Sequence, residues 1–281
     1  MFHIQKMSAE DLEFAVSLTD TMEWSMTEDD FKFSMKIEPE GCFVLFSGAE
    51  RVGIITSVSY GKLGWLGDLI VDKYHRGRGA GSLLAKKVIE YLKGRGVQTI
   101  GLYAYMDKIP FYTRLGFKND REFVTLSGKN SCRVASASEG VRGAAKTEIP
   151  KIIELDSRCF GSSRTKVLKS ILQGAESLCL VIARDDGLNG YAIASVYDDT
   201  AEVGPFGCHR SHAVSSVHLL KALLARLGNV HVSMCAPKDE SAILHAASGC
   251  GLAEGFHVAR MFHGPAILSG CVYAAESLER G

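Results

Sequence analysis

The sequence predicts an α/β protein whose strands form a mixed sheet and whose chain consists of two similar halves. Three observations support this prediction. Short β-rich runs alternate with amphipathic helical stretches along the 281 residues. One stretch, from Asp68 to Gly96, has the order strand, glycine-rich turn, helix. A weaker version of the same succession of elements returns in residues 147–281.

The composition limits the classes of protein that the chain can belong to. A length of 281 residues suits one large domain or two of ordinary size, and 46% hydrophobic residues can build proper cores. A net charge of zero argues against a broad nucleic-acid surface. No apolar run reaches transmembrane length, and residues 1–10 lack a signal-peptide core. We therefore expect a cytoplasmic protein that binds neither nucleic acid nor membrane.

The eight cysteines are scattered, and none of them forms a C-x-x-C pair. This spacing argues against a zinc ribbon or a thioredoxin-like motif. For a cytoplasmic protein we expect all of these thiols to be reduced.

The elements before Asp68 are predicted from helix-capping residues, helix-breaking residues and hydrophobic periodicity. A short strand is predicted at 2–5. Ser8 is a suitable N-cap, with Asp11 at N3, for a helix that reaches about Met22. Thr27 is expected to cap a second helix over 28–37, which Pro39 ends. Residues 41–47 and 52–60 are β-rich and predict a hairpin around 48–51, and a third strand leads into Asp68.

The stretch after Asp68 carries most of the functional information. Leu69, Ile70 and Val71 form an apolar run that suits a buried strand. The glycine-rich turn and an amphipathic helix follow. The first N–H groups of a helix have no partner within the helix and attract anions, and glycines allow the backbone to approach a phosphate. We therefore predict a phosphate or pyrophosphate site in the turn, which consists of Arg76, Gly77, Arg78, Gly79, Ala80 and Gly81.

Two common nucleotide motifs do not fit this turn. A Walker loop requires G-K-[ST], which is absent here. A Rossmann fingerprint requires a third glycine where Ser82 stands, and an acidic residue near the strand 97–105, which contains none. What remains is the pattern R-x-x-G-x-G, made by Arg76, Gly79 and Gly81. The alternative is a tight turn that only starts a helix.

A second motif follows the strand 97–105. It has the form F-Y-x-x-x-G-F, from Phe111 to Phe117, after a short helix start at Pro110. The two motifs, and the order of elements around them, resemble the GNAT acetyltransferases over residues 1–128. The resemblance implies a mixed sheet in which the strand before the glycine-rich turn and the strand after the central helix splay apart. It also implies that this turn binds the pyrophosphate of acetyl-CoA and that pantetheine enters the gap.

The resemblance further implies transfer of an acetyl group from acetyl-CoA to an amine. Tyr112 would protonate the leaving thiolate, and backbone N–H groups around Leu69 to Val71 would stabilise the developing oxyanion. The amine must lose a proton before it attacks, and Asp68 is the candidate base. Tyr112 could instead be a core aromatic, and Asp68 could cap a turn or pair with Arg76. Glu23 and Glu28 lie in the helical region that lines the acceptor cleft in the family.

Residues 129–146 are rich in small and basic residues and predict a linker. Residues 147–281 look like a degenerate GNAT copy. Helices are predicted at 150–159, 215–227 and 242–249, and strands at 178–184, 190–196, 201–206 and 230–235. The loop 207–212 lacks a G-x-G pair, so we expect no coenzyme in this half. Several short pieces resemble the second domain of tandem GNAT proteins: Asp156, Phe160-Gly161, Arg164, Gly190-Tyr191, Gly204-Pro205, Arg260-Met261 and Gly264.

His209, His212 and His218 fit no standard zinc spacing, so no metal is expected. The predicted acceptor is a primary amine of a small or amino-acid-like molecule, and a homodimer is possible for this fold. Two alternatives stay open. One is a non-catalytic regulatory module that binds acyl-CoA. The other is an acetyltransferase acting on protein lysines or N-termini, which a long open groove would favour and a closed cleft would oppose.

Overall fold

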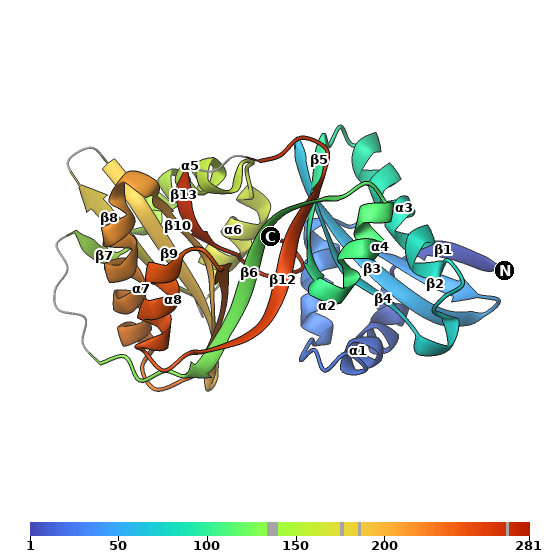
Figure 1. The fold of residues 1–281 in the computed structure, drawn as a ribbon, viewed down its shortest axis with the longest axis horizontal. Coiled ribbons are helices and arrows are strands. Elements are labelled where there is room, and N and C mark those ends of the chain that lie inside the picture. The colour runs from blue at the N-terminus through green and yellow to red at the C-terminus, as the bar shows by residue number, and fades with distance from the viewer. Residues whose placement is uncertain (134–139, 175–176, 185–186, 268–269) are drawn as a thin grey trace.

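The computed structural model describes residues 1–133, 140–174, 177–184, 187–267 and 270–281. Within these residues, thirteen strands form a single mixed sheet that runs through both halves of the molecule. Helices cover the faces of the sheet (Figure 1). The strand order is β1-β2-β3-β4-β5-β12-β6-β11-β10-β9-β8-β7, and β13 pairs with β10 off this path. The predicted α/β class with a mixed sheet is confirmed.

The first half follows the order expected from the sequence. Its strands are β1 (Phe2–Lys6), β2 (Phe43–Ser47), β3 (Glu50–Tyr60), β4 (Leu63–Val71), β5 (Thr99–Tyr105) and β6 (Lys118–Lys129). Its helices are α1 (Leu12–Asp20), α2 (Glu28–Ile37), α3 (Ala80–Gly94) and α4 (Ile109–Arg114).

The predicted capping box at Ser8 is present, and Thr27, which was expected to cap α2, forms a second capping box with Asp30. The Ser8 amide donates to Asp11 Oδ2 at 2.8 Å, and the Thr27 amide donates to Asp30 Oδ2 at 2.8 Å. Each carboxylate therefore satisfies a backbone donor that the first turn leaves unpaired.

The second half contains α5 (Ile149–Phe160), α6 (Thr165–Gln173), α7 (Ala213–Leu227) and α8 (Ser241–Ser248). Its strands are β7 (Val141–Gly143), β8 (Ser177–Arg184), β9 (Gly187–Tyr197), β10 (Thr200–His209), β11 (His231–Pro237), β12 (Ala253–His263) and β13 (Cys271–Ala274). The sequence did not predict α6, β12 or β13. The predicted linker contains β7, and its residues 134–139 lie outside the described residues, as do Asp185 and Asp186 between the predicted strands 178–184 and 190–196.

The two halves exchange strands. β6 leaves the first half and pairs with β11 of the second, with Leu126 opposite Met234. β12 leaves the second half and pairs with β5 of the first, with Met261 opposite Leu102. β6 and β12 also pair with each other, and Figure 1 shows them side by side across the middle of the molecule. The sheet is continuous because each half lends its last long strand to the other.

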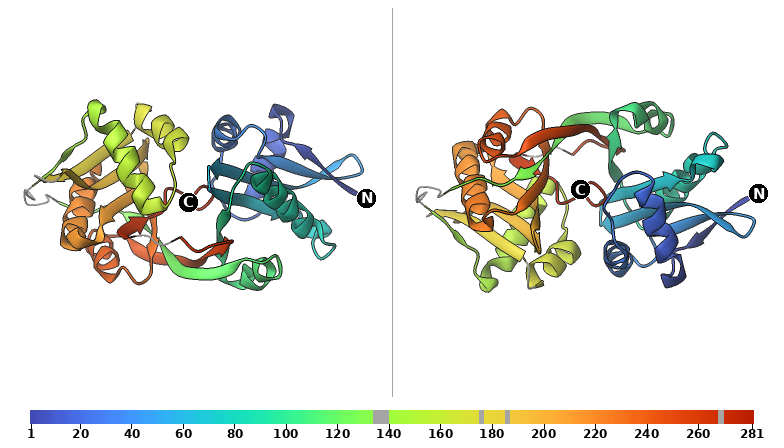
Figure 2. Two further views of the ribbon diagram at one scale, coloured as in Figure 1. Left: turned by 90° about the horizontal axis from the view of Figure 1, so that it is seen from above. Right: turned by 90° about the horizontal axis from the view of Figure 1, so that it is seen from below.

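The C-terminal turn, which comprises residues 276–281, lies between the two halves (Figure 2). The Gly281 amide donates to the Ser277 carbonyl at 3.1 Å and closes the turn. Tyr60 and Trp65 of the first half donate to the carbonyls of Arg280 and Leu278, at 2.9 and 3.3 Å. The first half therefore holds the turn through hydrogen bonds to its backbone.

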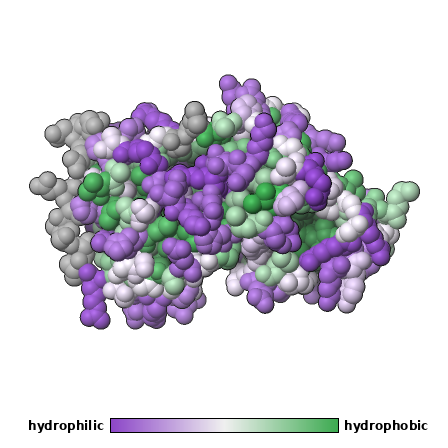
Figure 3. Space-filling model, viewed as in Figure 1, coloured by the Kyte–Doolittle hydropathy of each residue, from purple (hydrophilic) through white to green (hydrophobic). Residues whose placement is uncertain are grey.

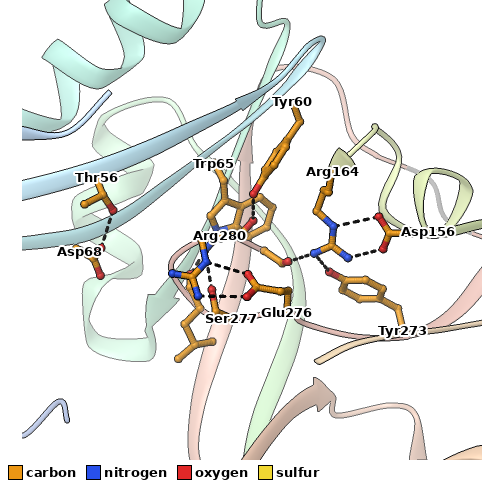
Figure 4. Close-up of polar contacts among 12 residues, drawn as sticks. Thr56, Tyr60, Trp65, Asp68, Asp156, Arg164, Tyr273, Glu276, Ser277 and Arg280 are labelled. Atoms are coloured by element: carbon orange, nitrogen blue, oxygen red, sulfur yellow. Dashed lines mark hydrogen bonds and ion pairs between the residues drawn. The ribbon is translucent and has the colours of Figure 1, made fainter. Parts of the chain in front are cut away.

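A buried ion pair of the second half holds the same turn (Figure 4). Arg164 and Asp156 are both 0% exposed, and Arg164 Nη2 lies 2.6 Å from Asp156 Oδ1. Arg164 Nη1 donates to the Tyr273 hydroxyl at 3.2 Å and to the Gly281 carbonyl. Tyr191 donates to Asp156. Asp156, Arg164 and Tyr191 come from three of the short pieces that resemble tandem GNAT proteins, and they form one hydrogen-bond network.

One sequence expectation is wrong. Cys159 of α5 and Cys271 of β13 form a disulfide, whereas all thiols were expected to be reduced. The two residues are 112 positions apart, and only the packing of α5 beside β13 brings them together. Spacing along the chain therefore gave no signal of this pair. The other six cysteines are free.

The surface seen from the side of Figure 1 is largely hydrophilic, and polar side chains extend across the junction of the halves (Figure 3). Among the described residues, no helix has the length and apolar character needed to cross a bilayer.

Candidate active site

A cavity opens where β4 and β5 separate. The two parallel strands pair only over Leu63–Trp65 with Thr99–Gly101, and beyond Trp65 they diverge. The cavity in this gap has a volume of about 570 Å³. The walls come from β4, β5, β12, the start of α3, α4 and the C-terminal turn. The splayed strands that the resemblance implied are therefore present, and residues from both halves enclose the space between them.

The glycine-rich turn forms one end of the cavity. Gly77 and Gly79 have φ values of 76° and 82°, which favour glycine because other side chains are strained there. A Cβ atom on Gly79 would meet nothing within 4 Å, so space remains beside the turn. The first intrahelical bond runs from the Leu83 amide to the Gly79 carbonyl. The amides of residues 80–82 therefore have no partner within α3, and a negatively charged group fits here.

The two arginines of the turn differ in position. Arg76 lines the cavity, and its Nε donates to the Val71 carbonyl at 2.8 Å. This bond holds one edge of the guanidinium group at the end of β4, while the residue as a whole stays exposed. Arg78 is exposed and is not among the residues that line the cavity. Gly77, Gly79, Ala80 and Gly81 all line it.

The backbone of β4 forms a second wall. Leu69, Ile70 and Val71 all line the cavity. The pairing of β4 with β3 shifts register between Ile54 and Thr56, which places a β-bulge at Asp68 and Leu69. The Asp72 amide donates to Val52 of β3, so the alternation along the strand directs the Val71 amide away from β3, toward the gap. Beyond Trp65, backbone groups of β4 therefore face the gap without a hydrogen-bond partner on β5.

Asp68 lies in the bulge and faces the cavity. Its φ of 49° is in the left-handed region, which is uncommon for a residue other than glycine. The side chain is 4% exposed. Thr56 donates to Oδ2 at 2.6 Å, whereas Oδ1 is buried without a hydrogen-bond partner. Burial, and then the negative charge of Glu279, raises the pKa of Asp68 to about 7. Asp68 forms no ion pair with Arg76, which was one of the two alternatives left open by the sequence.

Tyr112 also lines the cavity, from α4. Its ring packs edge-on against Phe111 and Phe117, with centroids 4.9 and 5.8 Å away. Burial raises the pKa of the Tyr112 hydroxyl above its ordinary value, so this group stays protonated at neutral pH. The structure thus combines the two roles considered from the sequence: the ring is part of the core and the residue borders the cavity.

Glu23 and Glu28 are exposed, and neither is among the residues that line the cavity. The Oε2 atom of Glu28 lies 3.0 Å from Nζ of Lys32, which is one helical turn later. Their predicted role in the acceptor site stays a prediction.

Several lining residues were not identified as site residues from the sequence. One of them is Trp24. Its Nε1 donates to the Tyr105 hydroxyl at 2.8 Å, and Tyr105 packs against Phe256 with centroids 5.3 Å apart. Leu278 and Glu279 enter from the C-terminal turn. No local signal marks Phe256 or Glu279, because the exchanged strand and the turn come from the far end of the chain.

Gly67 explains how the turn reaches β4 so closely. A Cβ atom on Gly67 would lie 2.5 Å from the Glu279 carbonyl oxygen and 2.8 Å from its Cα. Only glycine leaves room for the turn at this position. The cavity of the first half is therefore completed by the second.

The equivalent gap of the second half is filled by the chain itself. β10 and β11 pair in parallel only over Thr200–Val203 with His231–Met234, as β4 and β5 do at their start. Beyond that point β13 pairs with β10, with Phe206 opposite Ala274 and His209 opposite Cys271. β13 occupies the place that corresponds to the open gap of the first half.

No group of three or more histidine, cysteine, aspartate or glutamate side chains that could hold a metal ion occurs in the described part of the chain. His209 and His212 are near each other, with ring centroids 6.4 Å apart.

Replacing Asp68 with asparagine is expected to stabilise the protein in a pH-dependent way. The folded-state pKa of about 7 lies above the unfolded value near 3.9, so the folded protein holds a proton that the unfolded chain releases. The stability penalty of Asp68 grows from about pH 4 to pH 7 and is constant above that range. In thermal unfolding at pH 8, Asp68→Asn should have a higher midpoint than the wild-type protein. At pH 4 the two midpoints should be nearly the same. An equal gain at both values would contradict the raised pKa.

Two family models match the chain. The model for the GNAT acetyltransferase family matches residues 6–117, and a second model for a GNAT acetyltransferase domain matches residues 152–271. Together they span most of both halves. The chain belongs to the GNAT acetyltransferase family. An uncharacterized N-acetyltransferase from Methanocaldococcus jannaschii is 34% identical over 98 residues, which are 31% of this chain. The match spans 43% of that relative's length.

Solved structures of tandem GNAT proteins share the whole fold. A Pyrococcus horikoshii protein named as an acetyltransferase has a TM-score of 0.82 at 22% identity, covering 100% of this chain and 96% of its own. A tandem GNAT protein from the clavulanic acid biosynthesis pathway has a TM-score of 0.63 at 16% identity, covering 95% and 100%. At these identities the likeness concerns the fold alone. The tandem arrangement of two GNAT domains is confirmed.

Proposed function

We propose that this protein transfers an acetyl group from acetyl-CoA to a primary amine of a small molecule, with donor and acceptor bound together in the cavity of the first half. The observation that carries the proposal is the geometry of this cavity. One end has the unpaired amides of α3 and the Arg76 side chain, which suit a pyrophosphate. Asp68 and Tyr112 border the same cavity, beside the backbone of β4.

GNAT proteins generally use acetyl-CoA as the acetyl donor, and the residues present fit this group. Ala80, Gly81 and Ser82 would receive the pyrophosphate through their amides, with Arg76 as a counter-charge. The slender pantetheine arm fits the gap between β4 and β5, where Val71 offers an unpaired amide. Acetyl-CoA supplies an activated thioester, whose carbonyl carbon is the centre that the amine attacks.

Side chains of the protein accept and donate the protons that move during the transfer. The Asp68 carboxylate takes a proton from the incoming ammonium, and its pKa of about 7 makes it a stronger base than an ordinary aspartate. Tyr112 holds a proton that it can donate to the departing sulfur, because a buried phenol remains protonated. Amides of β4 near Leu69 to Val71 stabilise the negative charge that develops on the acyl oxygen.

The C-terminal turn favours a small acceptor over a protein. Leu278 and Glu279 lie in the cavity wall, and Gly67 contacts the turn directly. A protein segment crossing β4 at this point would collide with a part of the chain that is hydrogen-bonded to Tyr60, Trp65 and Arg164. The closed wall supports the first hypothesis from the sequence over acetylation of protein lysines or N-termini.

Tyr112→Phe tests the enzymatic proposal against a binding module. We expect turnover with acetyl-CoA and an amine to fall by about 10²–10⁴, the usual contribution of a general acid, while acetyl-CoA affinity changes less than about threefold. Tyr74→Phe is the matched control, because it removes an exposed hydroxyl outside the cavity wall. Steady-state rates and calorimetry give the two quantities. Wild-type protein that binds acetyl-CoA but acetylates no amine would establish the non-catalytic alternative.

A further inference from the structure

The end of the cavity away from the glycine-rich turn is acidic. Asp68 and Glu279 both line it. Glu202 of β10 does not line the cavity, but desolvation, and then the negative charge of Glu279, raises its pKa to about 7. Asp30 of α2, which accepts a hydrogen bond from the Thr27 amide, also lies outside the cavity wall, and its negative charge acts on Asp68.

The positive charges nearby do not cancel these carboxylates. Arg280 donates to both carboxylate oxygens of Glu276, at 3.0 and 3.2 Å, and these two charges offset each other. Lys108, which directly precedes α4, pairs with Asp107 at 2.6 Å, and these two charges also offset each other. Arg114 lines the cavity from α4, whose Phe111 lies beside Gly81 of the turn, so Arg114 belongs with Arg76 at the coenzyme end. The acceptor end keeps a net negative charge.

Two carboxylates at this end have oxygens without a partner. Asp68 Oδ1 is buried and accepts no hydrogen bond. The Glu279 side chain is half-buried and has no hydrogen bond or close ion pair among the described residues, although the charge of the neighbouring Arg280 acts on it. Leaving the buried Asp68 oxygen without a donor is costly. A bound cation with several N–H donors is the complement that both groups lack.

Three aromatic side chains form part of the wall of the same cavity. Trp24 and Tyr105 are joined by a hydrogen bond and have ring centroids 6.3 Å apart. Phe256 packs on Tyr105 and is 46% exposed although it is a large apolar side chain. All three line the cavity. Such rings pack against methylene groups and attract ammonium groups through their faces.

We propose that the acceptor is an aliphatic diamine or a longer polyamine, in which one amino group lies at Asp68 and a second ammonium group binds Glu279. This inference rests on the proposed acetyltransferase function and specifies its acceptor. The methylene chain lies along Trp24, Tyr105 and Phe256. Acceptors with a carboxylate in place of the second amine are repelled by Glu279, which excludes amino-acid-like molecules of that shape.

The transfer is balanced with these groups. A C–N bond forms between the amine and the acetyl carbon, and the C–S bond of the thioester breaks. The ammonium loses two protons: one leaves through Asp68 to solvent, and the other replaces the proton that Tyr112 gives to the sulfur. The products are an N-acetylated amine that keeps its second ammonium, the free thiol of coenzyme A and one released proton.

Three acceptors with the same carbon chain test this inference: 1,4-diaminobutane, n-butylamine and 4-aminobutanoate. At about pH 8.5, where Asp68 is ionised, we expect kcat/KM for the diamine to exceed that for butylamine by about tenfold or more, as one partly buried ion pair allows. 4-Aminobutanoate should be the poorest acceptor. Glu279→Gln should lower kcat/KM for the diamine by about tenfold, mainly through KM, and leave butylamine within about twofold.

Two further variants make the test specific. Glu279→Asp keeps the charge and should retain much of the preference for the diamine. Glu40→Gln removes an exposed carboxylate that pairs with Lys6 outside the cavity wall, and should leave the preference unchanged. Binding of 1,4-diaminobutane, measured by calorimetry, should be lost in Glu279→Gln and kept in Glu40→Gln.

The outcomes separate the inference from the function on which it rests. Turnover of all three amines without preference for the diamine, or a preference that Glu279→Gln leaves intact, overturns the inference and leaves the acetyltransferase function standing. Absence of acetyl-CoA-dependent turnover with every amine overturns both.

Discussion

Gly79→Glu is expected to lower kcat/KM for acetyl-CoA by at least about 100-fold. The substitution places a carboxylate beside the unpaired amides of α3, where the pyrophosphate would bind. A Cβ at this position meets no other atom within 4 Å, so the new side chain can be accommodated without a clash. The loss should therefore come from charge repulsion and from occupation of the anion site. Steady-state kinetics with a saturating amine measure it.

Gly61→Glu is the matched control for this variant. Gly61 has φ of 83°, close to the 82° of Gly79, and a Cβ there also meets nothing within 4 Å. It lies in the exposed turn between β3 and β4, outside the cavity wall. Both substitutions carry the same backbone strain, of about 1–2 kcal/mol. Activity that falls equally in both variants, or that stays within threefold in Gly79→Glu, would contradict the assigned coenzyme site.

Arg164→Met is expected to destabilise the protein by about 3–5 kcal/mol, because it leaves the Asp156 carboxylate buried without its counter-charge. The variant also frees the Tyr273 hydroxyl and the Gly281 carbonyl from their shared donor. The C-terminal turn then loses its anchor in the second half, so Glu279 and Leu278 should no longer be fixed in the cavity. Urea unfolding followed by circular dichroism gives the stability change. At a temperature where the variant is folded, KM for the amine should rise more than KM for acetyl-CoA.

Two comparisons make the Arg164 result interpretable. Arg158→Met breaks an exposed ion pair with Glu154 on the same stretch of chain, and should change stability by less than about 1 kcal/mol. The double variant Asp156→Leu with Arg164→Met removes both buried charges and should recover part of the loss, since the unpaired carboxylate is gone. If Arg164→Met unfolds at the same urea concentration as Arg158→Met, the network does not hold the two halves as described.

The sequence predicted the first half well because its signals are local. Thr27 and Asp30 lie three residues apart and start α2 at the expected position. The glycine-rich turn leads directly into α3, as the sequence predicted, and two of its glycines, Gly77 and Gly79, have positive φ angles. The separation of β4 from β5 was expected only through the resemblance to the GNAT family, because no residue pattern states where two distant strands part.

The remaining features depend on contacts between residues far apart in the chain. β12 inserts between β5 and β6, and β13 fills the gap beside β10, although neither strand was predicted. Glu279 is 211 positions from Asp68, yet its charge contributes to the raised pKa of that carboxyl. Cys159 and Cys271 are joined for the same reason, after α5 and β13 meet. The end of the cavity that contains Glu279 and Phe256 could not be found from the sequence, because its walls come together only in the folded chain.

The proposed function requires one coenzyme site per chain, in the first half, because β13 occupies the equivalent place in the second. Calorimetric titration of the intact protein with acetyl-CoA counts these sites. We expect one molecule bound per chain, and no binding heat with Gly79→Glu. Two molecules per chain would show that β13 does not block the second gap, and no binding to the intact chain would contradict the coenzyme site itself.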